Sequence, residues 1–167
     1  GNWTLYFVCS DGSRITYESN NSGEFYCQST NETLKGEKFT TSWIAYRHRE
    51  IIKDFALVSA ISYFMTGDEN ESKIAVDILL QYSQIYPSLP ITDKRNHSGD
   101  EGGKLTTQSL DEAILLIDFA WVYHLVKPVM NSSEKLAVEN NLLLAGLEVL
   151  DSPGNLEKNA LSNWYTY

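Results

Sequence analysis

The pattern of apolar and polar positions changes near Trp43. Upstream of it, β-prone residues gather in short runs, which the turn signals Asp11-Gly12 and Asn20–Gly23 separate. Downstream, apolar residues recur at the spacing of one helix face. The pattern therefore predicts a small β-rich extension over residues 1–40 and a helical region over residues 41–167. The three β-prone runs are Thr4–Val8, Arg14–Glu18 and Glu24–Gln28.

Four helices and the start of a fifth are predicted in the helical region. Thr41 and Ser42 offer N-caps to the first helix, and the stretch from Asn131 to Glu134 has a capping-box pattern ahead of the fourth. The third helix is apolar nearly all round, so we expect it to be deeply buried. The predicted spans are Trp43–Met65, Glu71–Ile85, Thr106–Val126, Asn131–Leu150 and a segment that begins near Leu156.

The order of these elements predicts a mainly α protein built from antiparallel helical hairpins. Short turns join the first helix to the second and the third to the fourth, whereas a long segment joins the second to the third. The last residues fall within a helix, so the chain looks truncated. A ring or solenoid of such hairpins would need further repeats to close.

The long connection Pro87–Lys104 leads into the most distinctive segment of the chain, Gly102–Glu112. Loops of this length inside compact domains are often functional. Lys104 would lie near the positive end of the third helix dipole, where anions are favoured, and Gln108 could point out of the helix mouth. The alternative is an ordinary loop with an N-cap and a glutamine that satisfies a neighbouring backbone group.

The net charge of the chain limits the classes of ligand that it is expected to bind. The chain has 167 residues, with 13 Lys and Arg against 22 Asp and Glu, and a formal net charge of −9. No basic run exceeds Lys94-Arg95, so we expect no nucleic-acid partner. No apolar run approaches the roughly 18 residues that cross a bilayer, so we expect no membrane span. A polyanionic ligand would need a locally basic site.

Two cysteines, Cys9 and Cys27, leave alternatives open. They could close one disulfide in an oxidising compartment, or they could remain as two thiols. Six Asn-x-Ser/Thr sequons fit a secreted chain, and an Asn- and Ser-rich bacterial composition explains them equally well. There is no CxxC pair and no metal-ligand spacing among the histidines, so we expect no metal site.

Several common catalytic signatures are absent from the sequence, among them GxSxG, the Walker loop, GxGxxG and HExxH. His48 and His124 fall within predicted helices, where a lone histidine is more often a packing residue. Asp111 and Glu112 are neighbours on a helix and point about 100° apart, so they do not form the facing pair of a glycosidase. A structural role near the helix start is expected for both carboxylates.

The last stretch combines polar and aromatic side chains. Asn163 and Trp164 stand side by side, which suits a sugar cleft, because Trp stacks on pyranose rings and Asn hydrogen-bonds hydroxyl or carboxyl groups. The alternative is the start of an amphipathic helix with aromatic core contacts.

Four segments, taken in order, span nearly the whole chain and carry a family resemblance. They are Val8–Gly12 with Cys27 and Trp43; Tyr63–Glu69 with Ala75–Ser83 and Tyr86-Pro87; Gly102–Ala113 continuing to Ala120–Tyr123; and Asn163–Tyr167. Together they resemble the N-terminal part of the heparinase II/III-like and alginate-lyase-like polysaccharide lyases. Asn163–Tyr167 is similar to the Asn-Trp-Gln-Thr-Trp helix start of that family.

The resemblance implies a fold and an activity. The fold is an incomplete (α/α) toroid of antiparallel helical hairpins, here with a small N-terminal β-hairpin region. The activity is β-elimination on uronate-containing acidic polysaccharides such as heparan sulfate, hyaluronan, chondroitin or alginate, and it needs no cofactor. By position, Asn163 is similar to the catalytic asparagine that neutralises the substrate carboxylate. The residues that would bind substrate along the cleft are Lys104, Gln108, Trp164 and Tyr167.

The sequence also departs from the family. Trp164 stands where some relatives have a histidine, and the catalytic tyrosine and second histidine of the family would lie beyond residue 167. We therefore expect one side of an active site, completed by the remainder of a secreted or periplasmic lyase chain. The alternatives are a non-catalytic acidic-glycan-binding or scaffold domain, a uronate C5-epimerase on the same scaffold and a toroid glycoside hydrolase.

Overall fold

The computed structural model describes residues 9–13, 16–17, 24–35, 37–95 and 97–160. Contacts between residues divide the chain into two compact units, Gly1–Ile44 and Ala45–Tyr167. The described strands belong to the first unit, and most of the helical residues belong to the second. The predicted mainly α fold with a small β-rich N-terminal region is confirmed.

The first unit contains a three-stranded antiparallel sheet in the order β1-β2-β3. The strands are β1 (Thr16–Tyr17), β2 (Glu24–Cys27) and β3 (Glu32–Lys35). β1 and β2 lie within predicted runs, whereas β3 was not predicted, and the run Thr4–Val8 lies outside the described residues. The thiols of Cys9 and Cys27 are joined in a disulfide, which answers the question that the sequence left open.

The first long helix is continuous from Glu37 to Thr66. It consists of α1 (Glu37–Glu50), a π-helical segment (Ile51–Leu57) and α2 (Val58–Thr66), and Gly67 ends it with a φ of 76°. The helix begins six residues before the predicted start at Trp43, so the prediction of N-caps at Thr41 and Ser42 is wrong. Both residues lie inside α1, where the helical backbone hydrogen bonds are already made.

The remaining helices follow the predicted order. Asp68 caps α3 by accepting a hydrogen bond from the backbone N–H of Asn70. The predicted capping box is confirmed, because Asn131 accepts from the backbone of Ser133 and Glu134, and Glu134 accepts from the backbone of Asn131. The bounds are α3 (Glu69–Ile85), α4 (Ser109–Val126), α5 (Ser132–Val138), a π-helical segment (Glu139–Leu144), α6 (Ala145–Leu150) and α7 (Pro153–Ala160).

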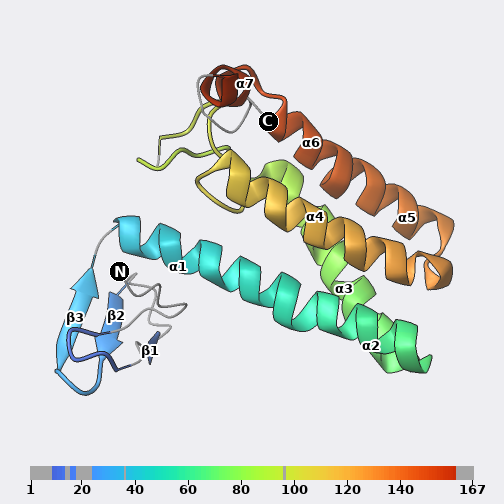
Figure 1. The fold of residues 1–167 in the computed structure, drawn as a ribbon, viewed down its shortest axis with the longest axis horizontal. Coiled ribbons are helices and arrows are strands. Elements are labelled where there is room, and N and C mark those ends of the chain that lie inside the picture. Colours follow the sequence, from blue (N-terminus) through green and yellow to red (C-terminus); the bar gives the residue numbers. More distant parts are fainter. Residues whose placement is uncertain (1–8, 14–15, 18–23, 36, 96, 161–167) are drawn as a thin grey trace. The chain divides into compact units, whose positions relative to one another are not determined.

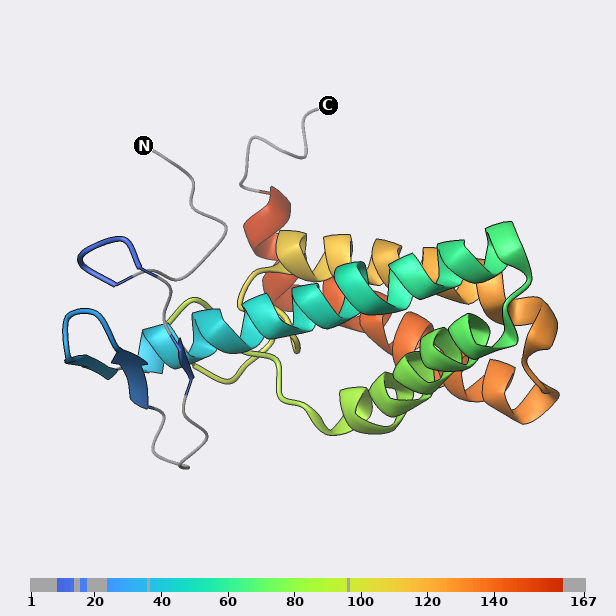
Figure 2. The ribbon, with the colours of Figure 1, turned by 90° about the horizontal axis from the view of Figure 1, so that it is seen from below.

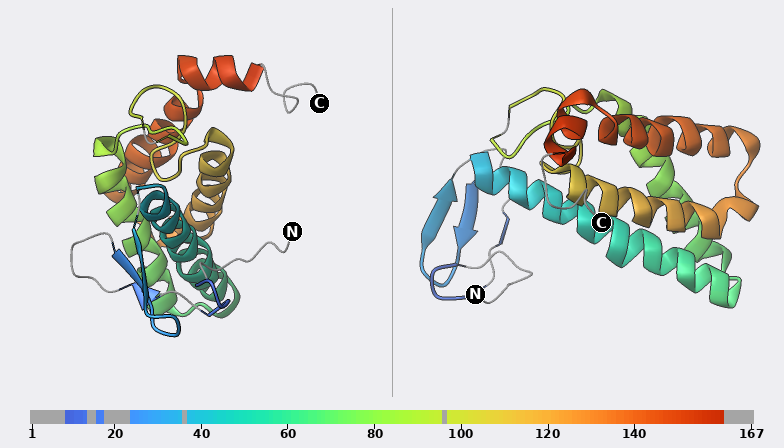
Figure 3. Two further views of the ribbon diagram at one scale, coloured as in Figure 1. Left: turned by 90° about the vertical axis from the view of Figure 1, so that its left-hand side faces the viewer. Right: turned by 45° about the horizontal axis from the view of Figure 1, so that its top comes forward.

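Two antiparallel hairpins pack together in the second unit. The helix ending in α2 pairs with α3, and α4 pairs with the helix formed by α5 and α6 (Figures 1 and 2). α4 also contacts α2, α3 and the first π-helical segment, so it packs against both hairpins. Both short turns lie at one end of the bundle, and the α3–α4 connection and α7 lie at the other (Figures 1 and 3). The largest apolar side chains of the core include Ile52, Leu79, Tyr86, Leu115, Phe119 and Leu142.

The third helix was expected to be deeply buried, and it is buried on one face only. One face of α4 packs into the core, but a second apolar stripe is open, and Trp121 on it is 57% exposed. Its members recur at spacings of four, three and four residues, which places them on one helix face. They are Leu110, Ile114, Ile117 and Trp121, named below the α4 stripe. In the described part of the chain, no helix is long and apolar enough to cross a membrane.

Candidate functional site at the start of α4

The connection between α3 and α4 is folded rather than structureless. The backbone of Thr92 pairs with Gly103 through two hydrogen bonds, of 2.9 and 3.3 Å, and Thr92 also pairs with Ser98. Gly102 has a φ of 107°, and a Cβ there would lie 1.9 Å from the carbonyl oxygen of Thr92. Glycine is therefore required at this position, since it alone tolerates both the conformation and the close approach.

Glu112 lies beneath this loop and is fully buried. Its carboxylate accepts hydrogen bonds from the backbone N–H groups of Leu105 (3.1 Å) and Thr106 (3.0 Å) and from the Thr106 hydroxyl (3.1 Å). The Tyr86 hydroxyl donates to it at 2.7 Å. A Cβ on Gly103 would lie 2.5 Å from the carboxylate, so the loop backbone passes directly over it. These contacts fix the path of the loop.

Tyr86 keeps its proton in this arrangement. Burial raises the pKa of its hydroxyl far above the ordinary value, and the neighbouring negative charge of Glu112 and their hydrogen bond raise it further. The hydroxyl therefore acts as a fixed donor to Glu112 at neutral pH. The pair joins the C-terminal end of α3 to the first turns of α4.

Lys104 is held at the end of α3. Its Nζ donates to the carbonyl oxygens of Tyr86 and Pro87, each at 3.1 Å, and lies 5.1 Å from the centre of the Tyr86 ring. An ammonium group carries three hydrogens, and these two bonds leave one for another acceptor. Cations are favoured at this place because the last carbonyls of a helix are partly negative.

Gln108 occupies the N-cap position of α4 with an extended backbone, and its side chain does not cap the helix. Its carbonyl oxygen accepts from the backbone N–H of Glu112 at 2.9 Å and also lies 2.9 Å from the Thr106 hydroxyl oxygen, so the single hydrogen of that hydroxyl is shared between this carbonyl and the Glu112 carboxylate. The half-buried side-chain amide has no hydrogen-bond partner among the described residues. An amide has two donor hydrogens and an acceptor oxygen, so this group can bind a sugar hydroxyl or a carboxylate.

The structure thus brings two of the predicted site residues, Lys104 and Gln108, onto the one loop that Glu112 organises. Asn163, Trp164 and Tyr167 lie outside the described residues. Glu112 was interpreted only as an acidic residue near a helix start. Its contacts with Leu105, Thr106 and Tyr86 connect the loop to the helix. They form only in the folded protein, and no residue spacing in the sequence predicts them.

The other candidate groups have their own contacts. Asp111 pairs with Arg49 across α4 and α1 at 3.3 Å. His48 Nδ1 lies 2.7 Å from the Tyr82 hydroxyl, and burial lowers the pKa of this histidine. Across the described ranges, no three His, Cys, Asp or Glu side chains gather closely enough to hold a metal ion.

No family model matches the chain. Two curated proteins are similar to it. An exo-oligoalginate lyase from Saccharophagus degradans is 29% identical over 117 residues, which are 68% of this chain and 16% of that enzyme. An alginate lyase from Stenotrophomonas maltophilia is 28% identical over 104 residues, which are 61% of this chain and 14% of that enzyme. The chain therefore has a distant relationship to alginate lyases and matches about one seventh of their length.

Proposed function

We propose that this chain is part of a polysaccharide lyase that cleaves a uronate-containing acidic glycan by β-elimination, with alginate as the first candidate substrate. The observation that carries the proposal is the similarity to two alginate lyases. The geometry at the start of α4 supports it, because one ammonium hydrogen of Lys104 and the side-chain amide of Gln108 have no partner among the described residues and are available to a ligand. Both groups suit a polymer of carboxylated sugars.

The chemistry assigns a role to each site residue. The proton on C5 of a uronate becomes more acidic when its carboxylate is neutralised, and Asn163 is the residue proposed to do this. Lys104 and Gln108 would bind neighbouring carboxylate or hydroxyl groups, and Trp164 and Tyr167 would contact sugar faces. The base that removes the C5 proton and the acid that protonates the leaving O4 are assigned to the remainder of the lyase chain.

The α4 stripe supports the idea of a longer helical array. The α4 stripe is one of the apolar surfaces that the described bundle leaves open, as are Leu136, Leu144 and Leu147 on the last long helix. A further helical hairpin of an (α/α) toroid would cover it and extend the array. The similar lyases are about six to seven times as long as the stretch they share with this chain.

The proposed location is secreted or periplasmic. The disulfide between Cys9 and Cys27 supports it, because disulfides persist mainly in oxidising compartments. A location outside the cytosol also gives the enzyme access to polymeric glycans.

The first test is the absorbance of the 4,5-unsaturated uronate that β-elimination creates. This chain and any longer form of the gene product would be mixed with alginate, hyaluronan, chondroitin and heparan sulfate. We expect product from alginate with the longer form, and a fall in kcat/KM of about 100- to 1,000-fold in Asn163→Ala, as for the loss of one charge-stabilising donor. Absence of product with every glycan contradicts the lyase proposal.

A non-catalytic acidic-glycan-binding domain is the second candidate, and Trp164 in place of a histidine favours it. Such a domain would retain alginate on a column without making unsaturated product, and its retention would weaken as salt rises, because salt screens the charges. A C5-epimerase would instead exchange the C5 proton with solvent and leave the polymer length unchanged.

A further inference from the structure

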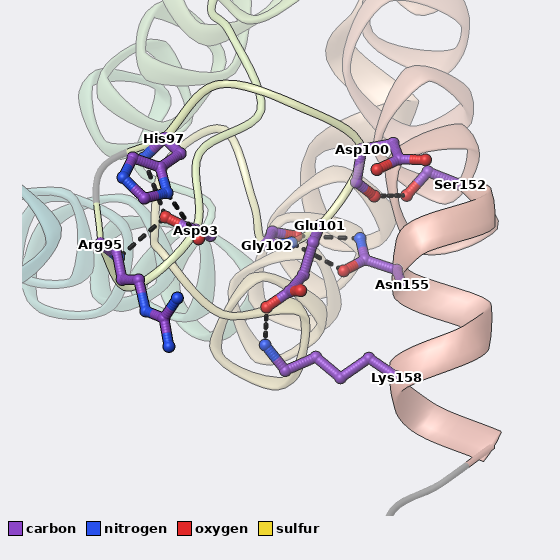
Figure 4. A network of polar contacts seen from close by, with 9 residues as sticks. All are labelled: Asp93, Arg95, His97, Asp100, Glu101, Gly102, Ser152, Asn155 and Lys158. Carbon is purple, nitrogen blue, oxygen red and sulfur yellow. Dashed lines mark hydrogen bonds and ion pairs between the residues drawn. The ribbon is translucent and has the colours of Figure 1, made fainter.

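The backbone on both sides of Lys104 is bound by fully buried polar side chains. Before it, the Asn155 amide oxygen accepts from the backbone N–H of Gly102 at 2.7 Å, and the amide nitrogen donates to the Gly102 carbonyl oxygen at 2.9 Å. Figure 4 shows this side chain reaching from α7 to Gly102. After it, the Glu112 carboxylate accepts from the backbone N–H of Leu105 at 3.1 Å. The backbone of Lys104 therefore lies between two fixed points.

The ammonium group of Lys104 is tied to the same network through Tyr86. Its Nζ donates to the carbonyl oxygens of Tyr86 and Pro87 and lies 5.1 Å from the centre of the Tyr86 ring. The hydroxyl of that fully buried ring donates to Glu112, which in turn binds the residue after Lys104. Tyr86 therefore contacts the ammonium group directly and fixes the backbone of Lys104 through Glu112.

Lys104 has no acidic partner in the described part of the chain. Arg49, Lys53 and Lys158 each pair with a carboxylate. The half-buried Lys104 has only carbonyl acceptors there, and one of its ammonium hydrogens is left over. Carbonyl dipoles offset only part of a full positive charge. An anionic ligand that accepts this last hydrogen would supply the opposite charge in a charge-assisted bond.

We propose that Tyr86 is a positioning residue for substrate binding and that it acts through Lys104. Its carbonyl oxygen and ring hold the ammonium group, and its hydroxyl holds Glu112, so that Lys104 meets a uronate carboxylate without first being ordered. A long side chain loses rotamer freedom when a ligand immobilises it, and a side chain that is already held has less to lose. Tyr86 touches no substrate in this scheme. The inference rests on the proposed function, because it needs a uronate-containing ligand.

The test is a double-mutant cycle with alginate, in the longest natural form of the protein that contains these residues. Tyr86→Phe keeps the ring and the carbonyl oxygen but removes the hydroxyl that binds Glu112. We expect KM to rise about 3- to 10-fold with little change in kcat, which is the size of effect for ordering one long side chain. In a Lys104→Met background the same substitution should change KM less than about 1.5-fold, because the group that it positions is absent.

Tyr82→Phe serves as the matched control. Tyr82 is a second buried tyrosine, one turn before Tyr86, and its hydroxyl lies 2.7 Å from His48 Nδ1. The control should lower the melting temperature, as Tyr86→Phe does, without changing KM or kcat. If Tyr86→Phe does not fold, Glu112→Gln goes through the same cycle. It keeps the shape of the side chain and weakens the charge-assisted bonds, so its expected rise in KM is smaller.

A second measurement follows the ammonium group without a substrate. Acetylation by an amine-reactive reagent, read by mass spectrometry of peptides, should be slower at Lys104 than at the exposed Lys94. Tyr86→Phe should speed the reaction at Lys104 severalfold and leave Lys94 unchanged. Equal rates at Lys104 in the two proteins would contradict its fixation by Tyr86.

The outcomes separate the possible failures. An unchanged KM in Lys104→Met, equal rises in KM from Tyr86→Phe with and without the Lys104 ammonium group, or a loss of melting temperature alone overturns the positioning role while the lyase proposal stands. Absence of unsaturated product from the unsubstituted protein refutes the proposed function, and the positioning role with it.

Discussion

At the scale of single residues, two buried polar side chains of this protein are hydrogen-bonded and join distant parts of the chain. Glu112 and Asn155 are both fully buried, and each binds backbone groups of the α3–α4 loop. A buried polar side chain is stable only when its hydrogen-bonding groups are satisfied. The loop backbone provides these partners, so loop and side chains depend on each other.

Replacing Glu112 should therefore destabilise the helical unit strongly. Glu112→Ala leaves the donors of Tyr86, Leu105 and Thr106 without their acceptor, and we expect it to lower the free energy of unfolding by about 3 kcal/mol or more. Urea unfolding followed by circular dichroism measures this. The exposed Glu157 provides the control, since Glu157→Ala should change stability by less than about 0.5 kcal/mol. Equal effects of the two substitutions would contradict the anchoring role of Glu112.

His48 should give the fold a pH dependence. Burial lowers its pKa in the folded state, so the unfolded chain takes up the proton first as the pH falls. Above the unfolded-state pKa of about 6.5 the histidine is neutral in both states and costs the fold nothing. As the pH falls from there through the lower folded-state pKa, the free energy of unfolding decreases. When the pH is lowered from about 7.5 to about 5.5, we expect the free energy of unfolding to fall less in His48→Gln than in the unsubstituted protein, as measured by urea titrations. Parallel losses in both proteins would show that other groups dominate.

At the scale of elements, the sequence predicts the helices well where local signals agree with packing. The capping box at Asn131 is a local feature, and the helix that it begins lies where expected. The predicted start of the first helix was wrong, because Thr41 and Ser42 lie inside α1 rather than ahead of it. The two π-helical segments were not predicted, because the spacing of apolar residues does not distinguish them from α-helix.

The cap of α5 can be tested by itself. Asn131→Ala removes the acceptor for the backbone N–H groups of Ser133 and Glu134, and we expect a loss of about 1 kcal/mol. Thermal unfolding measures it, with Asn131→Asp as the control, because aspartate caps a helix as well as asparagine does. A similar loss in both variants would contradict the capping explanation.

The candidate site was only partly predictable at this scale. Lys104 and Gln108 were singled out because glycines and a helix start flank them in the sequence, and their role in binding stays a prediction. The network under them was missed, because it joins Tyr86, Glu112 and Asn155 from three separate elements, and such contacts exist only after the hairpins have packed.

At the scale of the whole molecule, the two compact units have different sources of stability. The helical unit has a large apolar core, whereas the described strands have at most four residues each. So small a sheet is marginal alone, and small domains use disulfides to compensate. The Cys9–Cys27 bond spans 18 residues of the first unit.

Reduction should therefore weaken the first unit selectively. A disulfide closing a loop of this size contributes about 3 kcal/mol in the chain-entropy description. We expect a reductant to speed hydrogen exchange at the β2 and β3 amides while the amides of α3 and α4 stay protected. Mass spectrometry measures the hydrogen exchange of the reduced, alkylated protein and of the oxidised protein for comparison. Faster exchange in all elements would show that the units unfold together.

The two adjacent glycines of the α3–α4 loop affect how an alignment of relatives would be interpreted. A side chain at residue 102 would meet the carbonyl of Thr92, and one at residue 103 would meet the carboxylate of Glu112. Selection on folding alone would keep Gly102 and Gly103 unchanged, even in descendants that had lost all activity. Invariance at these two positions would therefore mark the shape of the loop, whereas variation at Lys104, which follows them, would be expected only if the proposed ligand changed.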